Sequence, residues 1–556
     1  MERVHALAEA HEQAGDFAAA WDCYQQALNE TPEDSELWRR AGALAQQAAD
    51  PVQAEKCLRR AVALAPDDLR ARIDLVGFLV DSNNGVAEEV GEDLEILCRQ
   101  LPGVPRLNKL LGQINNGLLR YEMAAEAFER ELEITPESAE CHLLLAQALS
   151  KSYQRFEEAD SAFDQAFALA TDKRIVALEI ARHFLQERRF DRVHHYCREV
   201  EGLLFDDTNG ALLQHIHGLA LKELGAVIEA EQAWAHALAA TDRLLVQQNV
   251  MAQLWGAGLK ARILQGGGDV AAARHLYGEL GGLIDASDYQ YAEGIYLPDT
   301  PSRLRRLKEI VAGRDIVVLL QGPSLAELEG NLERLARLDA CFASVNKFQA
   351  VEERLLFPIG RRLDLLLTGN PLDLGGRWSA YEAFLERADA NMLITSQYAA
   401  TGLPREHCTE PEFARRFDES LIYFSSEGPV PPLPVNPLHF VPANSLSILL
   451  PMLVLAEPRR IFLFGADGGA NPKAPDSPYF AKVDSPAEGE LRKVREMHRR
   501  MRNEAWECDI NAELSIIAAA ALHGVPEPAI YTCCPDSAYR LFPRITGEEG
   551  LARLGV

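Results

Sequence analysis

The feature that most constrains this chain is a proline that recurs at a nearly fixed interval in its first part. Pro32, Pro66, Pro102 and Pro136 are separated by 34, 36 and 34 residues. A repeat of this length is one supersecondary unit, which must stack on its neighbours to bury its apolar face. Because proline cannot continue a helix, each of these residues is expected to end the second helix of a two-helix unit. An all-helical solenoid is therefore predicted.

Small and large residues alternate inside these units in a constant phase. Gly42 and Gly218 are typical small residues, and the large residues that follow at the equivalent place are Tyr24, Leu58, Phe128 and Trp234. Small residues let two antiparallel helices approach closely, while the large ones fill the groove to the next pair. We expect about seven or eight helical pairs up to about residue 280.

These residues make the first half similar to the tetratricopeptide repeat family, whose unit has 34 residues. The resemblance implies a surface that binds protein or peptide, and it carries little information about chemistry. The repeat domain is predicted to span residues 1–280. A linker is predicted at 281–301, because Gly281-Gly282 and the run Tyr296–Pro301 interrupt the helical pattern.

Beyond the predicted linker, short apolar runs alternate with helical stretches. The runs are Ile316–Leu320, Ala340–Val345, Leu363–Leu367, Met392–Thr395, Leu421–Phe424, Ile461–Phe464 and Ala529–Thr532. The clearest helices between them are predicted at Ala326–Leu338, Leu446–Ala456 and Asn511–His523. Buried strands alternating with helices are typical of a mostly parallel sheet, so residues 302–556 are predicted to form an α/β domain. Ligands of such sheets bind beyond the carboxyl ends of the strands.

Polar or glycine-rich segments follow several of these runs. They are Gly322-Pro323-Ser324 after the first run, Asn346 after the second, Asn370 after the third and Asp467 after the sixth, with Asn444, Ser445 and Ser447 at the start of the preceding helix. Amides at a helix start favour anions, and asparagine side chains suit a sugar or a base edge. Taken alone, the first loop and the asparagines fit a turn or a helix cap better than a ligand site, and Asp467 fits a loop equally well. Their gathering at one edge of a sheet predicts a ligand site.

In this order the motifs resemble those of the bacterial CMP-sialic-acid-dependent sialyltransferases and the motility-accessory-factor flagellin glycosyltransferases, which share a domain with MptE-like pterin pyrophosphokinases. The resemblance covers roughly Arg314 to Phe542. By this resemblance, Gly322, Pro323 and Ser324 match the nucleotide-sugar loop, Asn346 and Asn370 the asparagines facing the donor, and Asn444, Ser445 and Ser447 a stretch at the donor carboxylate. Asp467 matches the motif acid, and Ser537 ends a late motif that begins at Cys534.

The resemblance implies an α/β Rossmann-like glycosyltransferase domain behind the repeats. It would move a sialic, pseudaminic or legionaminic acid from a CMP donor to a serine or threonine of a protein acceptor, with flagellin as the expected acceptor and the repeats as its binding surface. His498 or Glu504 would be the general base. Tyr479 would donate to the phosphate, and the amides of Gly322–Ser324 would stabilise the leaving group. No cofactor is required, no metal ligand is assigned, and the need for a divalent metal stays open.

Two departures from these families keep other interpretations open. Leu320-Gln321 replace the usual Gly-Asn before the loop, and Gly468 replaces an aromatic residue after the motif acid. A non-catalytic repeat scaffold with a degenerate nucleotide-sugar domain is one alternative. An MptE-like pterin pyrophosphokinase is another, although it needs a pair of metal-binding carboxylates of which only Asp467 is evident.

The net formal charge of −27 argues against non-specific binding to nucleic acid or anionic lipid. No apolar stretch reaches membrane-spanning length, and the first residues lack a secretory pattern, so we expect a cytoplasmic protein. The ten cysteines form no CxxC pair and are expected to be reduced thiols. Basic pairs interrupt the acidity at Arg361-Arg362, Arg459-Arg460 and Arg499-Arg500. Such pairs are typical of a solvated face or could offset the acidic surface near an anionic donor. The overall acidity therefore does not argue against such a donor in this domain.

Overall fold

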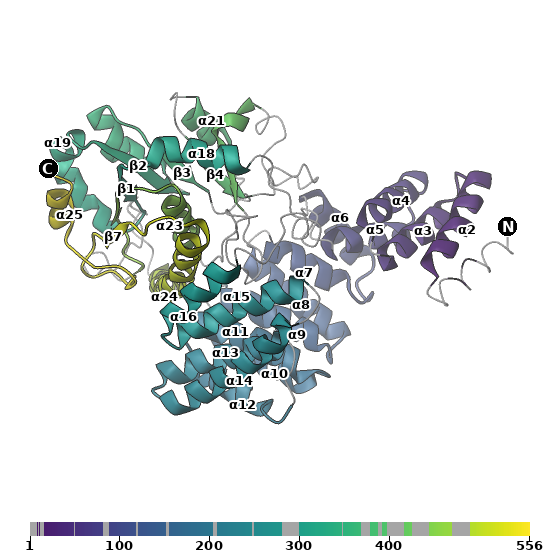
Figure 1. The fold of residues 1–556 in the computed structure, drawn as a ribbon. Helices are drawn as coiled ribbons and strands as arrows, with labels where there is room; N and C mark the ends of the chain where they lie inside the picture. Colours follow the sequence, from purple (N-terminus) through teal and green to yellow (C-terminus); the bar gives the residue numbers. More distant parts are fainter. Residues whose placement is uncertain are drawn as a thin grey trace. The chain divides into compact units, whose positions relative to one another are not determined.

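The structure is a computed structural model of the 556-residue chain. It describes residues 8, 11, 16–48, 50–81, 88–117, 120–151, 155–203, 208–246, 250–280, 300–346, 348–368, 378–386, 392–396, 416–424, 444–469 and 490–556. The chain is mostly helical and contains one parallel sheet (Figure 1). It divides into two compact units, one of Met1–Ala170 and one of Thr171–Gly402 with Cys408–Val556. The division falls inside the predicted repeat region, so the last repeats belong to the same unit as the sheet.

The first unit consists of helices that pair into successive hairpins. They are α2 (Phe17–Glu30), α3 (Ser35–Gln47), α4 (Pro51–Leu64), α5 (Leu69–Asp81), α6 (Glu88–Gln100), α7 (Leu107–Gly117), α8 (Tyr121–Ile134), α9 (Ala139–Lys151) and α10 (Phe156–Leu169). Helix α3 packs on α4, α7 on α8, and α9 on α10. The predicted helix–turn–helix repeat is confirmed in this unit.

The periodic prolines lie in a turn that is built the same way each time. Around Pro32, between α2 and α3, the Thr31 amide donates to the Ala27 carbonyl at 2.9 Å and the Asp34 amide donates to the Thr31 carbonyl at 3.2 Å. The same two backbone bonds recur around Pro66, Pro102 and Pro136. The proline period in the sequence therefore reflects the regular recurrence of one type of turn along the chain.

The alternation of small and large residues reflects close helix packing. A Cβ atom built on Gly42 would lie 2.7 Å from Cγ of Leu58, and one on Gly112 would lie 2.5 Å from the ring of Phe128. In the second unit, a Cβ on Gly218 would overlap the indole of Trp234. Any larger residue at these three glycines would push the two helices of a hairpin apart.

The second unit begins with further helices of the same kind. They are α11 (Lys173–Gln186), α12 (Phe190–Glu199), α13 (Thr208–Glu223), α14 (Val227–Leu245), α15 (Val250–Gly266) and α16 (Val270–Leu280), followed by α18 (Thr300–Val311). Of the predicted linker 281–301, the structure describes residues 300 and 301, which begin α18.

The strands lie where the apolar runs predicted them. They are β1 (Asp315–Leu319), β2 (Ala340–Val345), β3 (Leu365–Leu367), β4 (Met392–Ser396), β5 (Leu421–Phe424), β6 (Arg460–Phe464) and β7 (Ala529–Thr532). In the described part of the chain they form one parallel sheet in the order β5-β4-β3-β2-β1-β6-β7. The chain builds outward from β1 to β5 and then returns to the other side of β1 with β6. The direction of the strand order therefore changes between β1 and β6.

Helices cover both faces of this sheet. One face packs against α18, α23 (Ser445–Leu455) and α24 (Glu490–His523). The other face packs against η1 (Pro323–Asn331), α19 (Leu332–Ala336), α20 (Gln349–Val351), η2 (Glu352–Leu356), η3 (Phe357–Ile359), α21 (Trp378–Leu385) and α25 (Gly547–Arg553). The helix predicted at 326–338 is thus a 3₁₀ helix followed by one α-helical turn, and the helix predicted at 511–523 is only the last part of α24.

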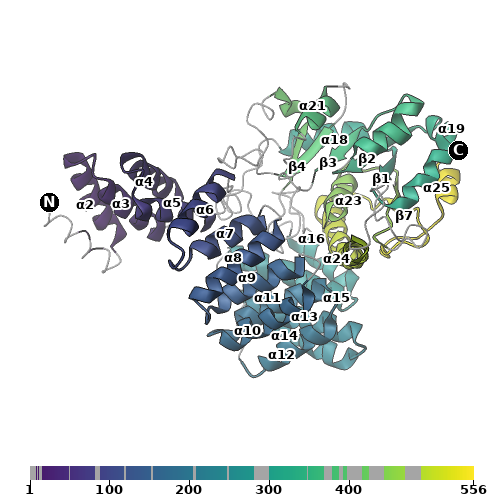
Figure 2. The same cartoon turned by 180° about the vertical axis from the view of Figure 1, so that it is seen from behind.

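Helix α24 is buried on two opposite sides. Cys508, Ala512 and Ile516 belong to the apolar core of the sheet, whereas Leu514 and Ile517 pack against alanines and a tyrosine of α15 and α16. Figures 1 and 2 both show α24 next to α23 and next to α15 and α16. The last repeats therefore complete the core of the sheet-containing unit.

Polar contacts join α24 to the same repeats. The Gln265 side chain donates to the Ile510 carbonyl at 2.9 Å and to the Glu513 carboxylate at 2.6 Å. Arg499 pairs at 2.7 Å with Glu187, the residue that follows α11. These contacts fix the position of α24 along the repeats as well as its rotation.

Truncation tests this shared core. A fragment of residues 300–556 leaves Leu514 and Ile517 without their cover, at a cost of roughly 3–6 kcal/mol for the two side chains. We expect this fragment to aggregate or to unfold at a lower temperature than a fragment of residues 171–556, which keeps the cover. Size-exclusion chromatography and circular dichroism melts compare the two fragments, and equal melting temperatures would contradict the shared core.

Buried histidines of the second unit predict a loss of stability in mild acid. Burial lowers the pKa of His215 to about 3 and those of His217 and His523 to about 4. Below about pH 6.5 the unfolded chain binds protons on these histidines that the folded protein does not bind. Burial raises the pKa of Asp509 to about 6 and also raises that of Glu507, which acts in the opposite direction. Three histidines outweigh two carboxyl groups, so the folded protein becomes less stable as the pH is lowered.

We expect a loss on the order of a few kcal/mol between pH 7 and pH 5, measured as the free energy of unfolding from urea titrations at each pH. Replacing His215 with glutamine should make this dependence shallower. Replacing the exposed His236 of α14 is the matched control and should leave it unchanged. A stability that rises toward pH 5 would refute the assignment.

Candidate functional site

The change of strand order brings the carboxyl ends of β1 and β6 together. Leu319 at the end of β1 is aligned with Phe464 at the end of β6. Past the strands, the Leu320 amide donates to the Phe464 carbonyl at 2.8 Å, and the Gly322 amide donates to the Gly465 carbonyl at 2.9 Å. A parallel sheet binds its ligands at such a switch point, so this edge is the candidate site.

Ser324 and Asp467 meet across this edge. The Ser324 hydroxyl donates to Oδ2 of Asp467 at 2.6 Å, and the Ser324 amide lies 3.2–3.3 Å from both oxygens of the same carboxylate. Asp467 is only 1% exposed, and the Cys534 thiol lies 3.8 Å from its Oδ1. Burial, together with the charge of Asp467, raises the pKa of the Cys534 thiol to about 11. Residues after β1, β6 and β7 are thereby joined into one buried cluster.

The loop after β1 is closed around this carboxylate. A Cβ atom on Gly322 would lie closer than 3.0 Å to Asp467 and to the Gly465 carbonyl, so only glycine fits. The amides of Gly322 and Ser324 already donate within the protein, and Pro323 has none. The expectation that these amides face a leaving group is therefore not met in this arrangement, because Asp467 occupies the place of the anion.

The end of β2 is joined to the start of α23. Asn346 has a left-handed backbone with a φ of 52°, and its side-chain amide donates to the Ser445 hydroxyl at 2.9 Å. Its backbone amide donates to the Leu367 carbonyl of β3 at 2.7 Å. The predicted strand-end asparagine and the predicted hydroxyl thus lie together. Asn370, the second predicted asparagine, lies outside the described residues.

Asn444 and Ser447 cap helix α23. The Asn444 side chain accepts from the Leu446 amide at 3.0 Å and from the Ser447 amide at 3.2 Å, and the Ser447 hydroxyl donates to the Asn444 carbonyl at 2.8 Å. Ser447 is fully buried. For these two residues the helix cap is the role that the structure shows, and the Ser447 hydroxyl is engaged inside the protein.

Ser537 and Tyr539 extend the cluster, and the sequence analysis did not single out Tyr539. The Ser537 hydroxyl is buried and donates to the Ala466 carbonyl, next to Asp467. The Tyr539 hydroxyl accepts from the Asn444 side chain at 3.2 Å, and burial raises its pKa. Its ring lies 3.2 Å from where a Cβ of Gly468 would be. Gly468 is a glycine because this tyrosine and the neighbouring helix leave no room for a side chain.

Of the two predicted bases, the structure brings Glu504 to this edge. Glu504 lies on α24 beside Ala505, which contacts Gly468, and its charge raises the pKa of Tyr539. His498 lies earlier on α24, but its side chain is outside the described residues, as is Tyr479.

Asp509, also on α24, is a further titratable group near Tyr539 that the sequence analysis did not assign to the site. Burial raises its pKa to about 6, and its carboxylate accepts from the Arg540 amide at 2.6 Å. A strongly shifted pKa near neutrality is the signal that marks such groups, and sequence alone does not carry it.

Three arginines of the basic pairs serve the fold. Arg459 and Arg460 both bind Asp315, at the amino end of β1, and these bonds overcome burial and lower the Asp315 pKa to about 2. Arg361 donates to the carbonyls of Leu338 and Ala340, before and at the start of β2. Arg459, Arg460 and Arg361 therefore lie at the edge of the sheet opposite the candidate site and do not offset the acidity near a donor there.

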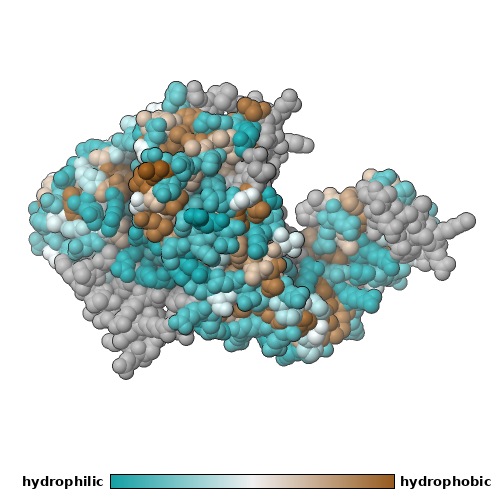
Figure 3. Space-filling view, turned by 90° about the horizontal axis from the view of Figure 1, so that it is seen from below, coloured by the Kyte–Doolittle hydropathy of each residue, from teal (hydrophilic) through white to brown (hydrophobic). Residues whose placement is uncertain are grey.

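Among the described residues, no group of three histidine, cysteine or acidic side chains is placed to hold a metal ion. Within the same residues, no helix combines the length and the apolar character needed to cross a membrane. On the face in Figure 3, most of the described surface is hydrophilic, and hydrophobic residues form small separate patches.

Comparison with known protein families gives a match for the first residues of the sequence. The tetratricopeptide repeat family matches residues 2–44. A tetratricopeptide repeat opens the chain. The repeats indicate a protein–protein interaction scaffold.

Similar solved structures include a MamA double mutant of strain RS-1, at 17% identity over 30% of this chain and 93% of that one, with a TM-score of 0.29. Another MamA crystal structure is 18% identical over 30% of this chain and 90% of that one, with a TM-score of 0.28. MamA 41-end from Desulfovibrio magneticus RS-1 is 17% identical over 30% of this chain and 93% of that one, with a TM-score of 0.29. The comparison with curated protein sequences gave no match.

A glycine substitution tests the closed loop. Gly322→Ala forces a methyl group against Asp467 and the Gly465 carbonyl, and overpacking of this kind typically costs about 1–3 kcal/mol or more. We expect a lower urea midpoint for Gly322→Ala. Gly330→Ala is the matched control, since Gly330 lies in the 3₁₀ helix that Gly322 precedes and has no atom within 4 Å of the new methyl group. Its midpoint should not fall. Equal midpoints for the two variants would rule out the close contact.

Proposed function

We propose that the second unit binds a CMP-activated nonulosonic acid at the carboxyl edge of β2, β1 and β6 and transfers the sugar to a hydroxyl of a protein acceptor that the repeats hold. The observation that carries this proposal is the gathering of polar strand-end groups at the change of strand order. Ser324 and Asp467 form one group there, and Asn346 and Ser445 form another. The motif order that resembles CMP-sugar transferases supplies the substrate class.

The two groups suit different parts of such a donor. Asn346 follows β2, next to β1, and its amide and the Ser445 hydroxyl are able to exchange their mutual bond for bonds to a sugar or a base. Asp467 fixes the loop after β1 through Ser324, so it acts on the donor by shaping the loop. Holding both loops in place before the donor binds reduces the cost of binding.

The transfer step needs a base and a leaving group. The acceptor oxygen forms a bond to the anomeric carbon, and the bond from that carbon to the phosphate oxygen breaks, so CMP leaves with the electron pair. A base removes the acceptor proton as the new bond forms. Glu504 is the described candidate for this role, since it lies on α24 close to Gly468 and Tyr539. His498 is the second candidate.

One observation favours a second function, a repeat scaffold whose sheet unit binds no donor. The Gly322 and Ser324 amides are both satisfied inside the protein, and the Asp467 carboxylate fills the space beside them. In this alternative the closed loop is purely structural. Donor binding separates the two functions, because only the first requires it.

Calorimetry on the full chain tests the proposal with CMP, CDP, UDP and GDP. We expect the cytidine nucleotides to bind and Asn346→Ala to weaken binding about tenfold, as loss of one or two hydrogen bonds does. Asn209→Ala, an exposed asparagine on α13, is the matched control and should bind as the wild type does. Absence of cytidine binding would leave the scaffold function.

Mass spectrometry of an acceptor incubated with a CMP-sugar then separates binding from catalysis. Glu504→Gln should bind CMP with unchanged affinity and transfer no sugar. Transfer at the wild-type rate by this variant would move the role of base to His498.

A further inference from the structure

A groove of ligand size runs along the outer side of β7, in the second unit. Its volume is about 400 Å³, within the range of small-molecule sites. Helix α16, helix α24, strand β7 and the segment that follows β7 all contribute to its lining. We call it the β7 groove. It lies beside β7, with residues 527–531 in its lining, and not beyond the carboxyl ends of the strands. It is therefore distinct from the candidate site.

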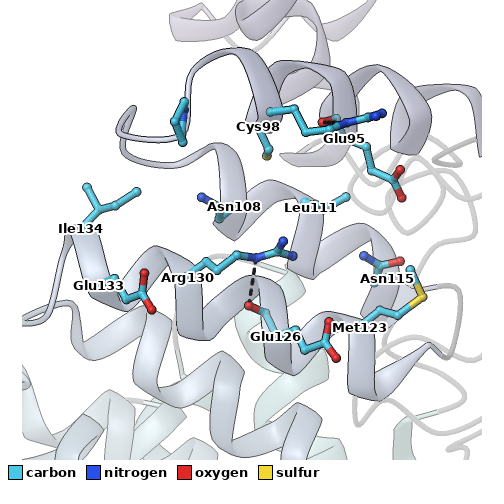
Figure 4. Close-up of a pocket in the computed structure, with 12 residues that line it drawn as sticks. Glu95, Cys98, Asn108, Leu111, Asn115, Met123, Glu126, Arg130, Glu133 and Ile134 are labelled. Atoms are coloured by element: carbon cyan, nitrogen blue, oxygen red, sulfur yellow. Dashed lines mark hydrogen bonds between the residues drawn. The ribbon is translucent and has the colours of Figure 1, made fainter.

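A groove of similar size in the first unit has a different lining. It lies between α6, α7 and α8, has a volume of about 460 Å³ and is lined by charged side chains such as Glu126 and Arg130 (Figure 4). Its surface is made of helices, whose main-chain groups bond within each helix, apart from the helix ends. The β7 groove differs because part of its surface is the side of a strand.

The strand pattern shows which main-chain groups of β7 face this groove. The Cys533 amide donates to the Leu463 carbonyl of β6 at 2.8 Å. Successive residues of a strand direct their main-chain groups to opposite sides, so Tyr531 also faces β6. Ile530 and Thr532 direct their amides and carbonyls away from β6. In the described part of the chain, β7 is the last strand on this side of the sheet.

The chain itself covers Thr532 and leaves Ile530 uncovered. The Thr532 amide donates to the Pro543 carbonyl at 3.0 Å, and the Thr532 carbonyl accepts from the Ile545 amide at 2.9 Å. Among the described residues, the amide and the carbonyl of Ile530 have no such partner, although Ile530 is only 6% exposed and lines the groove. Buried main-chain groups are nearly always paired. The β7 groove therefore presents one donor and one acceptor side by side.

The other groups in the lining leave no net charge for a ligand to meet. Arg274 of α16 forms an ion pair with Glu527, and the Glu513 carboxylate accepts from the Gln265 side chain at 2.6 Å. The rest of the described lining is mostly apolar. A charged ligand would lose its water here without gaining an unpaired counter-charge, which is costly. The groove therefore favours a neutral ligand.

The uncovered part of β7 is short, which favours a small molecule over an added strand. Residues from Pro543 to Ile545 already bond beside Thr532, so a further strand would pair with Ile530 alone. Strands usually have three or more residues. A flat lactam ring carries an N–H next to a C=O and forms both bonds to one residue. Phe542 in the lining offers an aromatic surface for such a ring.

We propose that the β7 groove binds a neutral, planar lactam, the group that uncharged nucleobases and many small cyclic amides contain. The Ile530 amide donates to the lactam oxygen, and the lactam N–H donates to the Ile530 carbonyl. Because the ligand contacts α16, α24 and β7 together, its binding stabilises the folded second unit. The inference does not rest on the proposed function, since it concerns another site and an uncharged ligand.

Oxindole, a flat and neutral lactam, is the probe that tests the proposal. Its matched control is N-methyloxindole, which keeps the rings and the carbonyl but has no N–H. Both are titrated into the full chain by calorimetry. We expect oxindole to bind and N-methyloxindole to bind about tenfold more weakly, as loss of one hydrogen bond does. Absence of oxindole binding would show that the Ile530 groups meet only water, and equal affinities would remove their role. Either result would overturn the proposal.

A variant then tests where the probe binds. Phe542→Ala removes an aromatic ring from the groove, and we expect it to weaken oxindole binding about tenfold. Phe357→Ala is the matched control, since this phenylalanine of η3 is 38% exposed and lies outside the groove. Thermal melts without the probe check that both variants are folded. Oxindole should raise the melting temperature of Phe357→Ala as much as that of the wild type. Wild-type affinity in folded Phe542→Ala would place the probe elsewhere and overturn the assignment.

Discussion

The double burial of α24 is the constraint on which the second unit depends. One side of this helix closes the apolar core over β1, β6 and α23, and the other side packs into α15 and α16. A helix that is apolar on two sides cannot be left at a surface without a large exposed patch. The last repeats are therefore part of the folding unit that contains the sheet, and the chain divides near residue 170.

This arrangement also positions the candidate site. Glu504 and Ala505 lie on α24 about one turn before Cys508, and the buried Ala505 packs against Gly468 in the loop after β6. The contacts of Gln265 and Glu187 hold α24 from the repeat side. The repeats thus set where α24 meets the loop that contains Asp467, although they contribute no side chain to that loop among its described contacts.

Local patterns in the sequence were sufficient for the strands and the repeat turns. Apolar runs predicted β2, β5 and β7 with their observed bounds, because a buried parallel strand needs apolar residues on both faces. The same patterns misjudged α24, since its first half is charged and its two-sided burial leaves no single apolar stripe. They also placed Gly322 and Asp467 at separate strand ends without indicating that the two segments bond to each other. Such a bond depends on the strand order, which no local pattern contains.

The net charge of −27 also does not predict the local charge at a site. Arginine pairs in the sequence suggested a cationic region near an anionic ligand, yet Arg459 and Arg460 neutralise the buried Asp315 at the opposite edge of the sheet. Buried carboxylates consume cations and amides throughout the protein, as Glu131 does at the start of α7. Charge counted along a sequence therefore says little about the charge that a ligand meets.

The position of α24 couples binding at the sheet edge to binding on the repeats. It is a single rigid element that touches the repeats on one side and the Asp467 loop on the other. A ligand at the sheet edge that prefers one position of α24 changes the stability of its packing on α15 and α16 by the same free energy. By reciprocity, a partner bound to α11, α15 or α16 that displaces α24 alters the affinity of the sheet edge by an equal factor. Any two ligands that act on α24 from its opposite sides are thus thermodynamically coupled without meeting.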